Sequence, residues 1–539
     1  MLFLKKYSLI SLFFLAATFV YSQGTVTGEL RKWHRVTISF DGPSTTEDAS
    51  INPFLEYRLN VTFTSPSGAT FIVPGFYAAD GNAAETSATS GNKWNVRFTP
   101  NETGTWTYEA SFRTGSNVAI SLDQNAGSPT SFDGASGNFS IGNSNKALPD
   151  NRAKGRLNYN GTRYLVFEET GTYFLKAGAD SPENLLAYGD FDNTVNSKTW
   201  APHSGDWRSG DPSWKGDRGR ELIGAVNYLA DQGMNAFSFL TMNVIGDGND
   251  VWPWAATSAN SLNNATGSDA NNRLRYDVSK LDQWEVLFNH AESKGMFIHF
   301  KTQETENDLL LDQGELGVQR RLYYRELIAR FGHHLALNWN LGEEHDLYDT
   351  DELGDTEGIR IKAYAQYIRA TDPYNHHIVI HAYPWGQDLL YPPLLGNASE
   401  LTGPSLQINI NDIHEDVKRW INDSQNAGKQ WVVTNDEQGS ADRGVTADAG
   451  FSGNKGTEGD NRFEVRHKVL WATYMAGGPV LNTILDTIPE RRTLLPKTLE
   501  VEEQNGKMLN VQWTSLIPIF LFGRWILEMN LLPRMQITV

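Results

Sequence analysis

One unit, an amphipathic helix followed by an apolar strand, recurs along residues 155–478 of this chain. In its first clear copy, Gly233 ends a helix and a strand follows at once. The apolar face of that helix comprises Leu222, Ile223, Val226, Leu229 and Ala230. Helices that alternate with strands build a parallel sheet, and a run of this length favours a closed (β/α)8 barrel, the TIM barrel, over a doubly wound sheet.

The pattern predicts seven strands before the chain changes character. They span residues 173–177, 236–242, 296–302, 335–341, 377–382, 405–410 and 430–435. None of the helices begins with a glycine-rich phosphate loop, which disfavours a nucleotide-binding fold. In a barrel of this class, function belongs to the carboxyl ends of the strands.

Adjacent carboxylates follow two of these strands. Glu343 and Glu344 come after strand four in LALNWNLGEEHD, and Asp436 and Glu437 come where strand seven breaks in QWVVTNDEQGS. Acids beside a buried strand are costly, because desolvation penalises their charged form. Two carboxylates delivered from two strand ends are what glycoside hydrolysis requires, so we predict a glycoside hydrolase.

The same two stretches resemble clan A glycoside hydrolases, which are retaining enzymes with the acid/base after strand four and the nucleophile after strand seven. WNLGEE is similar to their aromatic-x-aliphatic-x-Asn-Glu ending, and DEQG is similar to their Glu-aromatic-Gly ending. The resemblance implies Glu344 as acid/base and Glu437 as nucleophile. Because Glu343 stands where Asn is usual, Glu343 and Glu344 both remain candidates for the acid.

Four further stretches extend the resemblance over residues 26–478. ELRKWHRVTISFDGP, FLKAGADSPENLLAYGDFD, GMNAFSFLTMNVIGDGNDVWPW and WNLGEEHD resemble marine-type Bacteroidetes proteins that join an Ig-like domain to an apiosidase-like or agarase-like barrel. This likeness implies a secreted retaining enzyme that cleaves a polysaccharide or oligosaccharide of the algal cell-wall type. It would use two glutamates about 5–5.5 Å apart, and we expect no cofactor and no metal.

Further side chains at strand ends are predicted to bind substrate. These are Glu343, Asp436, His299, Gln303, Glu304, His381, Tyr383, Trp385, Trp252, Trp254 and Asn243. Several have an alternative role. Gln303 and Glu304 could hold a cation or cap the next helix, a barrel histidine is often a core residue, and the tryptophans are equally suited to core packing.

The chain before the barrel predicts export and an accessory domain. Residues 1–22 have Lys5 and Lys6, an apolar run too short to span a membrane, and a cleavage site that we place after Ser22. Residues 24–145 alternate with period two between turns, which predicts an Ig-like β-sandwich. The net charge of −18 argues against nucleic acid or membrane as a partner, and the absence of cysteine excludes thiolate chemistry.

Residues 479–539 differ in composition from everything before them. They hold two glycines, one aspartate and three of the eight methionines, and no eighth strand with a suitable loop is evident. We therefore hypothesise a reading-frame shift near Pro479, with strand eight missing or replaced. Two other functions stay open: a non-catalytic carbohydrate-binding or surface protein with a defective barrel, and a polysaccharide lyase with Tyr383 or His381 as base.

Overall fold

The structure is a computed structural model. It describes residues 23–179, 183–195, 198–246, 248–262, 272–345, 357–438 and 465–483. The predicted signal segment 1–22 and the tail beyond residue 483 lie outside the described residues. Within the described residues, every helix is too short or too polar to cross a lipid bilayer.

The N-terminal part consists of two antiparallel sheets, ordered β1-β2-β6-β5 and β4-β3-β7-β8, with β9 pairing β7. The strands are β1 Thr25–Gly28, β2 Val36–Thr46, β3 Tyr57–Thr64, β4 Thr70–Pro74, β5 Phe76–Tyr77, β6 Ser90–Phe98, β7 Gly104–Thr114, β8 Ser128–Pro129 and β9 Ser136–Ile141. Their inner faces meet in an aromatic core, where Phe63 of β3 stacks on Phe98 of β6 at 4.2 Å. The predicted two-sheet arrangement is therefore present, and its immunoglobulin-like topology stays a prediction.

The second part is a closed barrel of parallel strands. The strands are β12 Lys176–Ala179, β13 Ala236–Leu240, β14 Phe297–Lys301, β15 Leu337–Asn340, β16 His377–Val379, β17 His381–Ala382, β18 Ser405–Ile408, β19 Thr434–Gln438 and β20 Val480–Thr483. β16 and β17 are two halves of one strand interrupted at Ile380, and they pair β15 and β18 respectively. The barrel closes where β12 pairs β20, so it has eight strands in the described chain.

The eighth strand corrects one expectation. β20 lies between β12 and β19, with Lys176 opposite Val480 and Asn435 opposite Leu481. Strand eight is thus not missing, and the barrel extends beyond the predicted boundary at residue 478. Four residues followed by a tail of different composition give too weak a strand signal for sequence reasoning to detect.

Two predicted strands are displaced along the chain. Strand one begins at Lys176 instead of residue 173, and Tyr173 before it is 49% exposed. Strand seven begins at Thr434 instead of residue 430. Asp436 and Glu437 consequently lie inside β19, where the sheet fixes their backbone, and not in a loop after it.

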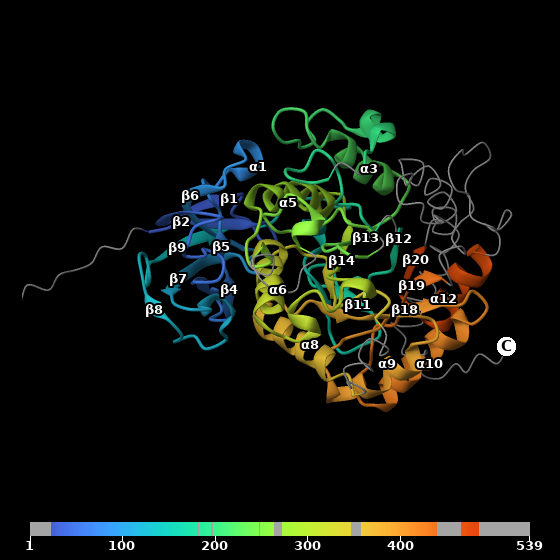
Figure 1. Ribbon diagram of the computed structural model, residues 1–539. Helices are drawn as coiled ribbons and strands as arrows, with labels where there is room; N and C mark the ends of the chain where they lie inside the picture. Colours follow the sequence, from blue (N-terminus) through green and yellow to red (C-terminus); the bar gives the residue numbers. More distant parts are fainter. Residues whose placement is uncertain are drawn as a thin grey trace, which may run out of the picture.

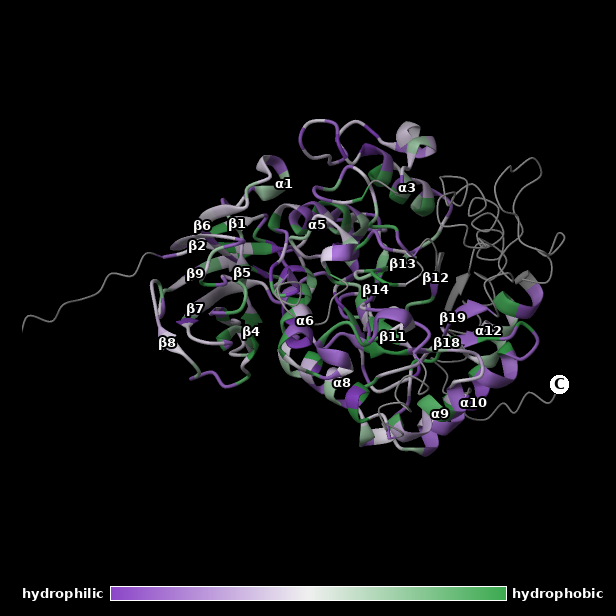
Figure 2. Ribbon diagram, viewed as in Figure 1, coloured by the Kyte–Doolittle hydropathy of each residue, from purple (hydrophilic) through white to green (hydrophobic). Residues whose placement is uncertain are grey.

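The helices surround the barrel (Figure 1). The longest are α3 Arg220–Asp231, α5 Val278–Ser293, α6 Val318–Phe331, α8 Ile359–Thr371 and α10 Ile413–Asn426. α5 begins at Asp277, whose side chain accepts a hydrogen bond from the Lys280 amide. α10 buries positions spaced three or four apart, and hydrophilic residues cover much of its outer face (Figure 2).

The sandwich packs on α5 and α6 (Figure 1). Arg325 of α6 donates to the Leu59 carbonyl of β3 at 2.8 Å, and Arg97 of β6 pairs Asp282 of α5 at 2.9 Å. Both contacts are buried. These helices lie outside the strands, so the sandwich covers one flank of the barrel and leaves the carboxyl ends of the strands to form the site.

Candidate active site at the carboxyl ends of the strands

The two pairs of adjacent acids share one design. In each pair, a buried lysine from another strand of the barrel neutralises the first acid. Lys301 at the end of β14 contacts Glu343 at 2.5 Å, and Lys176 at the start of β12 contacts Asp436 at 2.8 Å. All four of these side chains are buried, so each ion pair is held away from water.

Asp436 is tied down further by hydroxyl groups. Ser405 and Thr434 each donate to its Oδ2 at 2.7 Å. Burial alone would raise the pKa of Asp436, but the Lys176 charge and the hydrogen bonds from Lys176 and Ser405 hold it well below its ordinary value. Asp436 therefore stays ionised, and it binds Lys176, Ser405 and Thr434. These contacts do not suit a role in proton transfer.

His299 of β14 lies inside the barrel beside Lys176. Its Nδ1 is 2.9 Å from the Lys176 ammonium, and its Nε2 is 3.1 Å from the Asn340 amide. Burial and the Lys176 charge lower the pKa of His299 well below its ordinary value, so the ring is neutral. It is fully enclosed, and its contacts are to protein groups.

The second acid of each pair meets the other across the mouth of the barrel. The side-chain amide nitrogen of Gln407, on β18, donates to Glu344 at 2.9 Å and also to Glu437. Two oxygens within 2.9 Å of one nitrogen are at most about 5.8 Å apart, which is compatible with the roughly 5–5.5 Å of retaining glycosidases and shorter than the range of inverting ones. The structure therefore brings the side chains of Glu344 and Glu437 close together.

Glu344 is a carboxyl group of this site whose pKa is raised. Burial and the Glu437 charge raise its pKa to about 7, against the lowering effect of the Gln407 hydrogen bond and of His381. Its backbone is also unusual, with φ of 47° in the left-handed region. A carboxyl group that holds its proton near neutral pH can act as a general acid.

Glu437 contacts His381, which lies on strand five (β17). His381 Nε2 lies 3.3 Å from Glu437 Oε2, and His381 Nδ1 lies 3.2 Å from the Ser405 hydroxyl. His381, predicted as a substrate-binding residue, therefore lies beside the glutamate of strand seven. The loop after strand four is fixed to strand five, because the His345 amide donates to the His381 carbonyl at 2.9 Å.

Tyr383 and Trp385 follow β17 and stack on each other with ring centres 4.3 Å apart. Trp385 is 62% exposed, which is unusual for an indole and leaves much of the ring open to a ligand. An exposed aromatic face that follows a barrel strand suits the apolar face of a sugar ring. These two residues are the predicted binding residues with the greatest access to solvent.

Gln303 and Glu304 serve local structure. Glu304 caps the short 3₁₀ helix Thr305–Asn307, where the Asn307 amide donates to Glu304 at 2.8 Å. Gln303 accepts a hydrogen bond from Arg320 of α6. The alternative role of Glu304, capping, is the one observed.

Trp252, Trp254 and Asn243 come after β13 and are buried. The Trp252 indole donates to the Ala256 carbonyl at 2.9 Å, and Trp254 packs 5.7 Å from the Tyr323 ring. Asn243 pairs its backbone with Val251. Because protein encloses both indoles, core packing accounts for them and we do not carry a stacking role forward.

Sequence reasoning missed three groups of this site: Lys176, Lys301 and Gln407. Each occupies a barrel strand, and Lys301 and Gln407 lie at carboxyl ends, so the positional rule for barrels could have selected them. Glu183, which follows β12, was also missed, and it lies 3.4 Å from Lys301. These residues carry no motif of their own.

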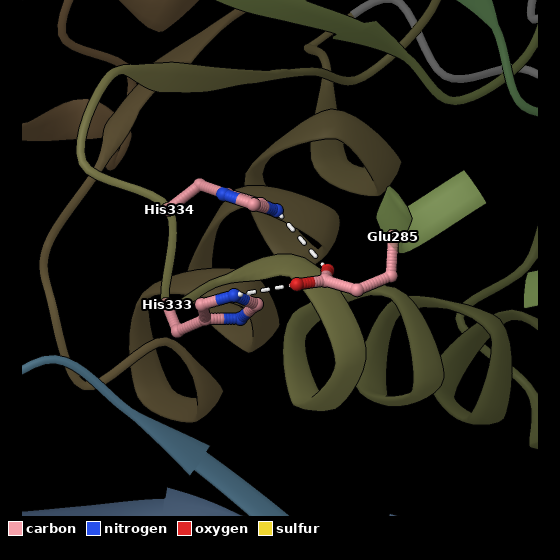
Figure 3. Close-up of side chains that lie close together, drawn as sticks. All are labelled: Glu285, His333 and His334. Atoms are coloured by element: carbon pink, nitrogen blue, oxygen red, sulfur yellow. Dashed lines mark hydrogen bonds and ion pairs between the residues drawn. The ribbon is translucent and has the colours of Figure 1, made fainter. Parts of the chain in front are cut away.

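A second buried cluster lies at the other end of the barrel, between α5 and the chain entering β15 (Figure 3). His333 and His334 each point a ring nitrogen at the Glu285 carboxylate, at 3.1 Å, with a spacing that could hold a metal ion. We call Glu285, Glu292, His333, His334, Arg35 and Arg97 the junction cluster. Arg35 and Arg97 contact Glu285 as well, and these two positive charges disfavour a metal cation there.

Comparisons with known proteins agree with this architecture. The profile described as a domain of unknown function (DUF5060) matches residues 29–113, within the sandwich. A Bacteroides vulgatus ATCC 8482 protein provisionally described as a glycoside hydrolase superposes with a TM-score of 0.51 at 15% identity, over 82% of this chain and 69% of that one. The chain is therefore similar to that protein in fold.

Two further solved structures superpose less closely on this chain. A family 5 glycoside hydrolase from Bacteroides vulgatus ATCC 8482 gives a TM-score of 0.41 at 15% identity, over 63% of this chain and 64% of that one. An exo-β-1,4-mannosidase from Opitutaceae bacterium strain TAV5 gives 0.36 at 12% identity, over 60% and 54%. No curated protein matches the chain.

Proposed function

We propose that this protein is a secreted retaining glycoside hydrolase that cleaves a polysaccharide or oligosaccharide of the algal cell-wall type. The observation that carries the proposal is the Gln407 amide, which contacts the carboxylates of strands four and seven together. A separation of at most about 5.8 Å leaves room for one anomeric carbon and no intervening water. That spacing supports double displacement over single displacement.

Glu344 is the proposed acid/base. Its pKa of about 7 keeps a proton available to the departing glycosidic oxygen at neutral pH. After the leaving group departs, the same carboxylate takes a proton from the incoming water. Glu343 is the weaker candidate for this role, because Lys301 is bound to it at 2.5 Å and stabilises its ionised form.

Glu437 is the proposed nucleophile. The Gln407 amide and His381 fix its carboxylate from two sides, and β19 fixes its backbone. One carboxylate oxygen attacks the anomeric carbon as the glycosidic bond breaks, which gives a glycosyl ester on Glu437. Water then attacks the same carbon, the ester bond breaks and the free carboxylate returns. No cofactor or metal is part of this proposal.

The likeness in sequence to marine-type Bacteroidetes enzymes with an Ig-like domain supports the algal substrate class. The apolar run within residues 1–22 supports export. The exposed Tyr383–Trp385 stack supports a carbohydrate chain as ligand. The lyase and the non-catalytic binding protein stay as alternatives, and no contact in the described residues favours either one.

Covalent trapping tests the proposal. The purified protein is screened on algal polysaccharides, and the matching fluorinated glycoside is then incubated with it before intact-mass analysis and peptide mapping. We expect one added glycosyl mass on the peptide that contains Glu437. Turnover without a trapped peptide, or a label on another carboxylate, would overturn the assignment, and unsaturated products that absorb in the ultraviolet would establish the lyase.

A further inference from the structure

Gln407 is the side chain through which the two proposed catalytic carboxylates are connected. It is 2% exposed, and its amide nitrogen donates one hydrogen bond to Glu344 and one to Glu437. An NH₂ group has two donors, so both are committed to the two glutamates. Hydrogen bonds from a buried amide to carboxylates are among the stronger ones in proteins.

An irregularity in the sheet places Gln407 in this position. β18 and β19 run in register from Ser405 opposite Thr434 to Leu406 opposite Asn435, and then Gln407 lies opposite Glu437. Asp436 is the additional residue of β19 at this bulge, and its carboxylate accepts a hydrogen bond from Lys176. Bulges of this kind commonly redirect a side chain beside an active site. Without it, Gln407 would face Asp436.

The backbone of Gln407 is anchored from outside the barrel. Gln387 of α9 (Gln387–Leu390) donates to the Gln407 carbonyl at 2.8 Å, and Trp420 of α10 donates to Gln387 at 2.7 Å. All three residues are buried. The amide therefore projects from a rigid strand and is not a mobile contact that forms only when substrate binds.

We propose that Gln407 is a positioning residue that holds Glu344 and Glu437 at the spacing of double displacement. This inference rests on the proposed function. The groups that face Glu344 are Glu437 of β19, His381 of β17, Glu183 after β12 and Gln407 itself. Gln407 donates a hydrogen bond to each carboxylate, so its loss should alter their protonation and their spacing together.

The test is Gln407→Met, which keeps the side-chain length and removes both donors. We expect kcat/KM to fall about 10- to 100-fold, the value of hydrogen bonds to charged groups. The basic limb of the pH–rate profile should move upward by about half a unit to one unit, because the hydrogen bond that lowers the pKa of Glu344 is gone. Gln407→Asn has a side chain one methylene shorter, and its kcat/KM and basic limb should lie between those of the wild type and of Gln407→Met.

The matched control is Gln283→Met, another buried glutamine, which lies on α5 and bonds the Asp192 amide at 2.8 Å. It should lower the melting temperature and leave the pH–rate profile in place. If Gln407→Met folds and keeps both the rate and the basic limb of the wild type, the positioning role is refuted. If Gln407→Met does not fold, Gln407→Asn decides by the same criterion. An inactive wild type would instead refute the proposed function.

Discussion

The mouth of the barrel and the junction cluster both bury carboxylates beside histidines, and they balance charge in opposite ways. At the junction, Glu285 faces two histidines and two arginines, which hold its pKa well below the ordinary value in spite of burial. At the mouth, Glu344 faces Glu437, and burial with this like charge raises its pKa to about 7. Both regions are desolvated, so the partners make the difference.

The comparison separates a structural cluster from a reactive one. His334 at the junction touches Glu285 at 3.1 Å and Glu292 at 3.3 Å, and although burial lowers its pKa, these acids raise it to about 9. Every charge there has an opposite partner. At the mouth, Lys301 and Lys176 neutralise Glu343 and Asp436 and leave Glu344 and Glu437 to repel each other. Carboxylates of like charge held this close together are typical of catalytic sites.

The largest expected effect is on turnover. Glu437→Gln removes the nucleophile and keeps the side-chain shape, so kcat should fall by about 10⁴-fold or more. The melting temperature should stay close to that of the wild type, because the charge lost was repelled by Glu344. Steady-state kinetics and a thermal melt of the same sample measure both quantities. A variant with most of its activity would remove the distinction between the two regions.

At the junction the expected effect is on stability. Glu285→Gln leaves the buried charges of Arg97 and His334 without their carboxylate, so unfolding free energy should fall by about 3–5 kcal/mol. Urea unfolding at pH 6.5 measures it. The matched control is Glu315→Gln, which removes a surface partner of Arg360 and should cost less than about 1 kcal/mol. Equal losses in the two variants would show that the junction cluster contributes no more to stability than an exposed ion pair.

At the mouth of the barrel, replacing Glu344 by glutamine should raise the stability of the protein instead of lowering it. The folded pKa of Glu344 lies above its ordinary 4.5, so the stability linked to its proton is present below pH 4.5 and is lost as pH rises through about 7. Glu344→Gln should therefore stabilise the protein by about 1–3 kcal/mol at pH 8 and change little at pH 4.5. Thermal melts of wild type and variant at the two pH values test the sign. A variant that is less stable at pH 8 would contradict it.

The smallest expected effect concerns the aromatic face. Trp385→Ala should raise KM for an oligosaccharide about 2- to 10-fold with kcat little changed, because stacking contributes to ground-state binding. The control is Tyr173→Ala, an exposed aromatic residue that precedes β12 and so lies at the opposite end of the barrel. Identical KM values in wild type and Trp385→Ala would remove Trp385 from the site.

The sequence predicted the barrel and its two acid pairs because both depend on local signals. The helical periodicity, and the position of Glu344 and Glu437 after apolar stretches of sequence, can be recognised without knowing which strands pair. The role of Gln407 is not readable in this way, because it depends on a bulge opposite β19. The junction cluster likewise requires α5, the sandwich and the chain before β15 to come together.

Other misses have equally specific causes. Trp252 and Trp254 are of the residue type that stacks on sugar rings, but both are buried in the protein. Aromatic content alone does not show which residues are buried. β20 was missed because Val480–Thr483 is short and precedes residues of different composition. The frame-shift hypothesis near Pro479 therefore concerns a point immediately before a strand that completes the barrel.

The central claim is that Glu344 and Glu437 act on one anomeric carbon by double displacement. The most direct measurement is proton NMR of the first-formed product on a polysaccharide that the protein cleaves, recorded before mutarotation. We predict that the new reducing end has the same anomeric configuration as the bond that was broken. An inverted product would contradict the account, because single displacement needs carboxylates farther apart than one Gln407 amide can join.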